Sequence, residues 1–328
     1  MSKFLIGSFG LLLAINLHAA AVTNHVVKSS GVSTNALDSN DPVEKEYLKL
    51  TADDDASQEE VDKWIRDNQE FAAKGAGISE AEMSRRIRER FEPIRKAYES
   101  FIKRYPDHAK ARVAYGSFLN DTHDEVGALT QWEKGRDLDP SNPAVWNNLA
   151  NVYGHEGPVK KAFEYYAKAI DLNPNEPVYY HNFGTTVYLF RKDAKEFYGI
   201  TEQEVFDKAL ELYSKALKLA PDDFPLATDV AQTYYGIKPL RADDALKAWT
   251  NTLAIAHDEI EREGVYLHLA RIKLAAGRFA ESRRHLNAVT NEMYTELKTR
   301  LTRNLNEQEK HAQEAATNSP PSAPEKKP

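Results

Sequence analysis

Apolar residues recur with the spacing of an α-helix along much of the chain. Between residues 59 and 108, Val61, Trp64 and Ile65 form one helical stripe, and a capping box formed by Ser57 and Glu60 predicts where that helix begins. Near the other end, a long polar segment carries an apolar residue at every fourth position: Met293, Leu297, Leu301 and Leu305. These patterns predict a chain built from α-helices.

A period of 34 residues runs through the middle of the chain. Pro140 and Pro174 are 34 positions apart, and Ala128 and Ala162 share this offset. Small residues such as Ala162 let two helices approach closely, and Pro174 ends the second helix of a pair because it lacks an N–H group. The segment 143–176 carries the complete pattern at nine positions: Trp146, Leu149, Ala150, Tyr153, Gly157, Ala162, Tyr166, Ala169 and Pro174. This pattern resembles the tetratricopeptide repeat (TPR), a helix–turn–helix unit.

The resemblance extends to looser copies on both sides. The predicted copies occupy about residues 109–142, 143–176, 177–223, 224–262 and 263–296. We interpret residues 59–108 as a divergent first repeat and residues 297–316 as a C-terminal capping helix. The resemblance therefore implies an all-α fold, a right-handed TPR-type α-solenoid of about five to six helical hairpins.

The chain begins with a segment typical of a signal peptide. Lys3 supplies a positive charge, residues 4–17 are mostly apolar, and residues 19–21 are small enough for cleavage, which predicts a signal peptide over residues 1–21. An uncleaved anchor or a buried helix is the alternative, but the apolar run is shorter than the roughly 20 residues that span a bilayer. We expect an exported protein, periplasmic or secreted from a bacterial cell envelope, with no integral membrane segment after cleavage.

Two further segments lack sustained periodicity. Residues 22–58 are polar and include three consecutive aspartates, so they predict a flexible N-terminal segment with at most one short helical turn near residues 43–50. Residues 317–328 are rich in proline and predict a disordered tail.

Composition and motifs narrow the function classes. The chain has no cysteine, which excludes disulfides, thiolate metal sites and cysteine nucleophiles. Its 43 Lys and Arg against 50 Asp and Glu give a net charge of −7, which argues against a nucleic-acid partner. No phosphate-binding glycine loop and no His-Glu-x-x-His motif occurs. We therefore expect no catalytic residue, no metal and no cofactor.

The resemblance implies a binding surface on the first helix of each pair. In TPR proteins these helices line a concave groove that takes an extended peptide or a partner helix. Asparagine side chains both donate and accept hydrogen bonds, which suits recognition of a peptide backbone. The alternative is that these residues are ordinary exposed polar positions of a repeat helix. The candidate partner-binding residues are Asn147, Asn148, Asn151, His181, Asn182, Thr185, Gln232 and Arg271.

The third copy contains thirteen extra residues, since Pro174 and Pro221 are 47 positions apart. In this insertion, Phe197, Tyr198 and Ile200 form either an aromatic contact surface on a protruding loop or an apolar face that packs back onto neighbouring helices. We favour the second interpretation, because an exposed aromatic patch promotes aggregation.

Together these observations predict a non-catalytic scaffold or adaptor for a protein or peptide partner in the cell envelope. Two alternatives stay open. One is an envelope hydrolase or a small-molecule-binding protein on a helical-repeat scaffold. The other is a self-associating structural protein, a homo-oligomer in which the apolar stripe from Met293 to Leu305 docks onto a second copy.

Overall fold

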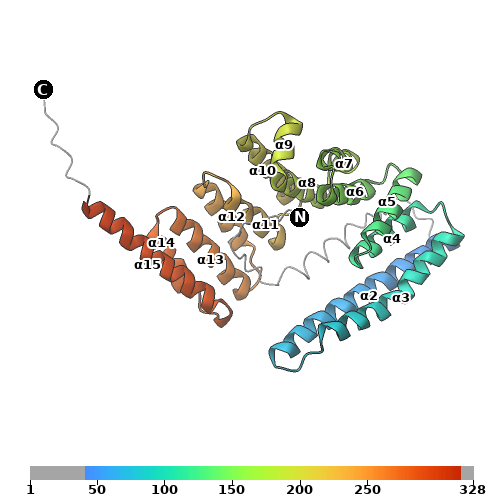
Figure 1. Ribbon diagram of the computed structural model, residues 1–328, viewed down its shortest axis with the longest axis horizontal. Helices are drawn as coiled ribbons and strands as arrows, with labels where there is room; N and C mark the ends of the chain where they lie inside the picture. The colour runs from blue at the N-terminus through green and yellow to red at the C-terminus, as the bar shows by residue number, and fades with distance from the viewer. Residues whose placement is uncertain (1–40, 319–328) are drawn as a thin grey trace, which may run out of the picture. The chain divides into compact units, whose positions relative to one another are not determined.

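The computed structural model describes residues 41–318, which form helices and no β-strand. It confirms the predicted all-α fold of TPR-type helical hairpins (Figure 1). The chain divides into two compact units, whose described parts are residues 41–219 and 220–318. The predicted signal peptide and most of the tail lie outside the described residues.

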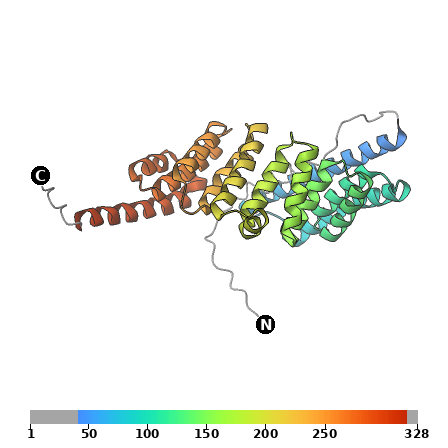
Figure 2. The same cartoon turned by 90° about the horizontal axis from the view of Figure 1, so that it is seen from above.

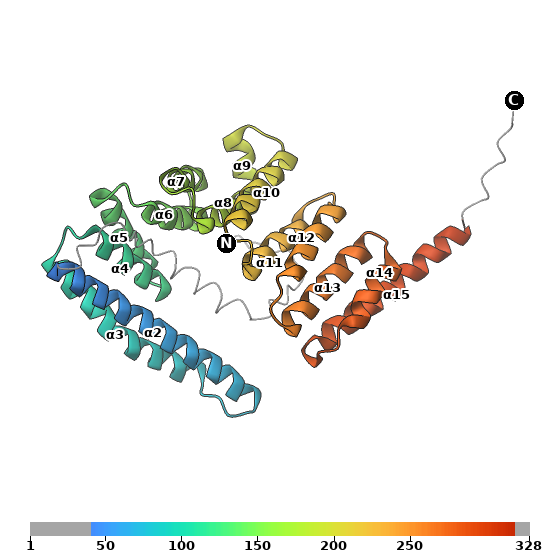
Figure 3. The same cartoon turned by 180° about the vertical axis from the view of Figure 1, so that it is seen from behind.

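The first unit begins with a long antiparallel hairpin, seen clearly in Figure 3. It consists of α2 (Pro42–Ala73) and α3 (Glu80–Arg104). The prediction of a flexible segment as far as residue 58 is wrong for residues 42–58, which belong to α2. Asp41 caps the helix by accepting a hydrogen bond from the Val43 N–H at 2.8 Å. Ser57 lies inside α2 and is fully buried, so it is not the predicted helix start.

The helix extends upstream because its first turns bury two apolar residues. Tyr47 and Leu50 are 1% and 6% exposed. Both pack in a cluster with Val61 on the same helix and with Tyr98 and Phe101 on α3. The stripe that begins at Val61 therefore starts four turns earlier than predicted, and α2 packs along α3 over its length.

Three further hairpins complete the first unit, and Figure 2 shows them as successive antiparallel helices. They are formed by α4 (Ala109–Asp121) with α5 (Glu125–Leu138), α6 (Pro143–Glu156) with α7 (Val159–Leu172), and α8 (Pro177–Leu189) with α9 (Arg191–Tyr198) and α10 (Glu202–Leu219). Small residues allow the close packing: a Cβ on Gly116 would lie 2.5 Å from the Trp132 ring, and one on Gly184 would lie 2.9 Å from Tyr213.

The second unit contains two hairpins and a terminal helix. Its elements are α11 (Phe224–Thr233), the 3₁₀ turn η1 (Tyr234–Gly236), α12 (Ala242–Ala254), α13 (Glu259–Ala275), α14 (Phe279–Ala288), the 3₁₀ turn η2 (Glu292–Tyr294) and α15 (Thr295–Asn318). Leu301 and Leu305 of α15 are buried, as expected for a helix that covers the last hairpin. Met293 belongs to η2 instead and is 57% exposed, so it does not continue this stripe.

Candidate partner-binding surface

Four polar side chains on the first helices of the first unit form a directional chain of hydrogen bonds, here called the asparagine ladder. Asn182 on α8 donates from Nδ2 to Oδ1 of Asn147 on α6 at 3.1 Å. Asn147 donates to Oδ1 of Asn148 at 3.3 Å, and Asn148 donates to Oγ of Ser117 on α4 at 3.4 Å. The ladder thus connects three successive first helices.

The ladder explains why polar residues occupy the interface between these helices. Asn147 and Asn148 are 1% and 8% exposed. A buried amide is tolerated when its hydrogen bonds are made, and the ladder makes them. At this exposure Asn147 and Asn148 hold the helices together instead of facing a partner, which separates them from the other candidate residues.

A second set of hydrogen bonds fixes Asn151, one turn after Asn147 on α6. The Tyr166 hydroxyl on α7 donates to Oδ1 of Asn151 at 2.6 Å, and Thr186 on α8 donates to Tyr166 at 3.1 Å. Tyr166 is buried, and burial raises the pKa of its hydroxyl, so it remains a donor at physiological pH. The carboxamide of Asn151 is therefore held in one orientation.

These bonds leave one donor and one acceptor uncommitted at the partly exposed end of the ladder. Within residues 41–318, Nδ2 of Asn151 and Oδ1 of Asn182 have no hydrogen-bond partner, and both side chains are half-buried. An N–H donor on α6 and a carbonyl acceptor on the neighbouring α8 match the two groups of a peptide unit, which offers a C=O and an N–H.

The neighbouring candidates on α8 lie beside this pair. Thr185 is half-buried and shares a 3.0 Å hydrogen bond with the Tyr213 hydroxyl on α10. The His181 ring lies 5.9 Å from the Tyr213 ring. The structure thus brings Asn151, Asn182 and Thr185 into one region of α6 and α8.

The insertion packs against α7, in agreement with the interpretation that we favoured. The Tyr198 ring stacks on Phe163 at 5.8 Å, and the Phe197 ring meets Phe163 edge-on at 5.4 Å. Lys160 of α7 forms an ion pair with Glu196 at 2.5 Å. Phe197 keeps 36% exposure, whereas Tyr198 and Ile200 are half-buried, so α9 mainly covers apolar surface.

The remaining candidates belong to the second unit. Gln232 is half-buried on α11, and the exposed Arg271 of α13 places its guanidinium 4.3 Å from the centre of the Tyr235 ring. Tyr235 shares a 2.9 Å hydrogen bond with Nδ1 of His268, whose ring stacks on Trp249 at 4.0 Å. Burial lowers the pKa of His268 to about 3, so this histidine is neutral at physiological pH.

Two partly buried carboxyl groups of the first unit were not predicted from the sequence. Burial raises the pKa of Asp54 on α2 to about 6, and burial together with the nearby Asp54 and Asp62 raises the pKa of Asp121 on α4 to about 6. The Tyr98 hydroxyl donates to Asp54 at 2.8 Å. Three consecutive aspartates suggested a solvated segment, and no local pattern distinguishes the one that faces the core.

Residues 41–318 contain no group of three or more histidine, aspartate or glutamate side chains arranged to hold a metal ion. In the same part of the chain, no helix has both the length and the apolar character needed to cross a bilayer.

Comparisons with known proteins place this architecture. The family model described as tetratricopeptide repeat matches residues 143–176. Photosystem I assembly protein Ycf3 from Prochlorococcus marinus (strain MIT 9211) is 30% identical over 137 residues, which cover 38% of this chain and 78% of that protein. The chain belongs to the tetratricopeptide repeat family.

Other TPR proteins show similarity at lower identity or over part of the fold. Ycf3 from Rippkaea orientalis is 30% identical over 131 residues, covering 39% of this chain and 72% of that protein. The crystal structure of PilW, described as a widely conserved type IV pilus biogenesis factor, is 13% identical, with a TM-score of 0.49, over 72% of this chain and 98% of PilW.

The TPR period explains why the ladder forms. Asn148 and Asn182 are 34 residues apart and occupy the same position in successive repeats, as do Ser117, Asn151 and Thr185. The bonded pairs lie close to this offset, 31 residues for Asn148 with Ser117 and 35 residues for Asn182 with Asn147, so the stacking of first helices brings them within hydrogen-bond distance from one repeat to the next. Membership of this family supports a protein–protein interaction scaffold.

Proposed function

We propose that this protein is a non-catalytic adaptor of the cell envelope that binds a partner peptide or helix along α4, α6 and α8. The observation that carries the proposal is a pair of oriented carboxamides: the acceptor of Asn182, where the asparagine ladder begins, and the donor of Asn151, one turn after the ladder residue Asn147. In this proposal the pair engages one peptide unit of the partner, and Thr185 and His181 contact the adjoining residues.

Preorganisation is the physical basis of the binding. A free asparagine side chain loses rotamer freedom when it binds, at a cost of about 0.5–1.5 kcal/mol. The two carboxamides are already fixed by Tyr166 and Asn147, so most of that cost is met during folding. Backbone recognition of this kind tolerates sequence variation in the partner, which suits an adaptor.

The relatives suggest the process that such an adaptor serves. Two of them are named photosystem I assembly proteins. By analogy we propose that this chain assists the assembly of a larger complex, by holding one component in an extended or helical form. The cell-envelope location in the proposal rests on the N-terminal sequence pattern alone.

Site-specific photo-crosslinking in cells tests the proposed surface. A photoreactive phenylalanine analogue placed at Asn151 should capture a recurrent partner, identified by mass spectrometry. The same analogue at Glu164, exposed on α7, is the matched control and should not capture it. Equal capture from both positions would contradict the proposed surface, and crosslinks only between copies of this chain would favour the self-associating alternative.

The export step has its own test. Full-length protein produced with its native N-terminus should be recovered from the periplasm or the medium with a new N-terminus near residues 19–21. Recovery of the unprocessed chain in the cytoplasm would remove the envelope from the proposal and leave the binding surface unaffected.

A further inference from the structure

A largely buried histidine joins the beginning of α2 to the connection between α3 and α4. His108 directly precedes α4, and its ring lies 4.8 Å from the Tyr47 ring on α2 and 5.1 Å from the Phe101 ring on α3. Both aromatic residues are 1% exposed, and the His108 side chain is 11% exposed. Figure 3 shows the beginning of α2 beside this connection. The imidazole ring is therefore part of the packing of the first unit.

The same ring caps α4. Nδ1 of His108 accepts a hydrogen bond from the Ala111 N–H at 3.0 Å, which satisfies one of the N–H groups left free at the start of a helix. A ring nitrogen that accepts carries no proton, so the proton of the neutral imidazole lies on Nε2. A second proton can bind only at Nδ1. Protonation of His108 therefore turns Nδ1 into a donor that faces the Ala111 N–H, and the cap is lost.

Two charged residues lie beside the ring. Glu44 on α2 places Oε1 3.4 Å from Nε2 of His108, and its charge favours the imidazolium. Lys110 on α4 lies 3.7 Å from the other oxygen of Glu44, so this carboxylate already has a cationic neighbour. The positive end of the α4 dipole also opposes a cation at the helix N-terminus. Burial, followed by the Lys110 charge, lowers the pKa of His108 below its ordinary value, against the opposing effect of Glu44.

The other titratable groups at this junction are neutral or paired. Burial raises the pKa of the Tyr47 hydroxyl well above its ordinary value, so this group stays protonated. Glu46 of α2 forms an ion pair with Arg104 of α3, and the Tyr105 hydroxyl of α3 donates to the same carboxylate at 3.5 Å. None of these groups neutralises a positive charge on His108.

We infer that His108 is an acid-sensitive latch that holds the N-terminal turns of α2 against α3 and α4. In its neutral form the ring packs between Tyr47 and Phe101 and caps α4. In its protonated form it loses the cap and brings a charge into an aromatic cluster, so the first turns of α2 separate from the rest of the first unit. The inference is independent of the proposed function, because it uses no residue of the asparagine ladder.

The sign of the pH dependence follows from the lowered pKa of His108. An unfolded histidine has a pKa of about 6.5, so below that pH the unfolded state binds more protons at this position than the folded state. The contribution of His108 to stability is therefore present above pH 6.5, and it is lost as the pH falls through the folded pKa. Asp54 and Asp121 act in the opposite direction between pH 6 and pH 4, so a variant is needed to isolate the histidine.

NMR of the full chain, with nitrogen-15 in its histidines, measures the protonation directly. At pH 7.5 we expect Nδ1 of His108 to show the chemical shift of an unprotonated acceptor, and its titration midpoint should lie below the ordinary value of about 6.5. Hydrogen exchange follows the latch itself. The protection of the amides of residues 46–50, corrected for the intrinsic effect of pH, should fall by about tenfold as His108 titrates. The amides of α7 should keep their protection.

Two variants separate the latch from a general effect of acid. His108→Asn keeps a side-chain oxygen that caps a helix but does not titrate, so the protection of residues 46–50 should change by less than about twofold between pH 7.5 and pH 4.5. Glu44→Gln removes the carboxylate that favours the imidazolium, so the midpoint of His108 should move to lower pH by on the order of 0.5 units. His311→Asn, at an exposed position of α15, is the matched control and should follow wild type.

Four results would overturn the inference. The first two are a proton on Nδ1 of His108 at pH 7.5 and a titration midpoint at or above 6.5. The third is protection of residues 46–50 that persists after His108 has titrated, which can be measured in wild type even if His108→Asn does not fold. The fourth is an equal loss of protection in wild type and in His108→Asn.

Discussion

At the scale of single residues, hydrogen bonding separates candidates that looked equivalent in the sequence. Asn147 and Asn151 lie one helical turn apart on α6, yet Asn147 is buried and both donates and accepts within the ladder. Asn151 engages its carbonyl oxygen, and its amide group has no hydrogen-bond partner within the described residues. The sequence placed both residues on the first helix of a repeat, but their roles depend on partners 15 and 35 residues away.

The buried member of the ladder should matter for stability. Asn147→Ala leaves the Asn182 amide and the Asn148 carbonyl without partners, and each unsatisfied buried polar group costs about 1–3 kcal/mol. We expect the free energy of unfolding to fall by about 2 kcal/mol in urea titrations. The control is Asn251→Ala at an exposed position of α12, which should change it by less than about 0.5 kcal/mol. Equal effects would show that the ladder contributes nothing.

The raised pKa values of Asp54 and Asp121, each about 6, predict a pH dependence of stability. Both pKa values lie above the unfolded value of about 3.9, so the folded state binds more protons than the unfolded state between pH 4 and pH 6. The contribution of these protons to stability is therefore lost as the pH rises through 6. Asp121→Asn should therefore stabilise the protein at pH 7.5, by on the order of 1 kcal/mol because the group is partly exposed. The gain should vanish near pH 4.

Thermal unfolding of wild type and Asp121→Asn between pH 4 and pH 7.5 measures this effect. Glu164→Gln on the exposed face of α7 supplies the matched control, and its stability should follow that of wild type. A variant that is less stable than wild type at pH 7.5 would contradict the assigned environment of Asp121.

At the scale of helices, the repeat region was predicted well and the first hairpin was not. The helices α4 to α8 carry small residues at the positions where two helices approach closely, such as Gly116 against Trp132, and this pattern is visible in the sequence. The first turns of α2 are marked only by Tyr47 and Leu50, which are followed by Asp53, Asp54 and Asp55. Their helical stripe becomes clear only when α3 is present to cover it.

This hairpin offers a direct test with adjacent residues. Tyr47 is 1% exposed and Leu48 is 37% exposed on the same turn of α2. Tyr47→Ala should lower the free energy of unfolding by about 3 kcal/mol, the usual cost of removing a buried aromatic ring. Leu48→Ala should cost less than about 1 kcal/mol. Guanidinium titrations measure both free energies, and hydrogen exchange reports on the N-terminal turns of α2. Similar losses for the two variants would mean that these turns do not pack on α3.

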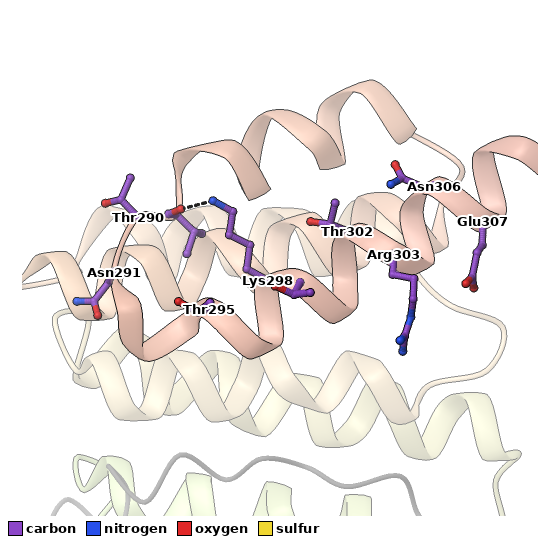
Figure 4. Close-up of a pocket in the computed structure, with 10 residues that line it drawn as sticks. Thr290, Asn291, Thr295, Lys298, Thr302, Arg303, Asn306 and Glu307 are labelled. Atoms are coloured by element: carbon purple, nitrogen blue, oxygen red, sulfur yellow. Dashed lines mark hydrogen bonds between the residues drawn. The ribbon is translucent and has the colours of Figure 1, made fainter. Parts of the chain in front are cut away.

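At the scale of the whole molecule, each unit contains polar groups that are preorganised by the fold. In the first unit the asparagine ladder orients one donor and one acceptor on α6 and α8. In the second unit the buried carboxylate of Glu263 holds the segment between α14 and η2 (Figure 4) by accepting from the Thr290 and Asn291 N–H groups. The sequence predicted the first set of groups by residue type but gave no sign of the second, because its residues come from a loop and a helix that meet only in the fold.

The most direct test of the central claim is the affinity of the captured partner for Asn151→Asp. This substitution keeps an oxygen that accepts from Tyr166 and replaces the free amide donor by a carboxylate oxygen, and the control variant adds the same negative charge elsewhere. Isothermal titration calorimetry should show at least a tenfold weaker complex with an unchanged melting temperature, while Asn175→Asp, at an exposed position between α7 and α8, binds like wild type. An unchanged affinity for Asn151→Asp would contradict the claim that this end of the ladder recognises the partner.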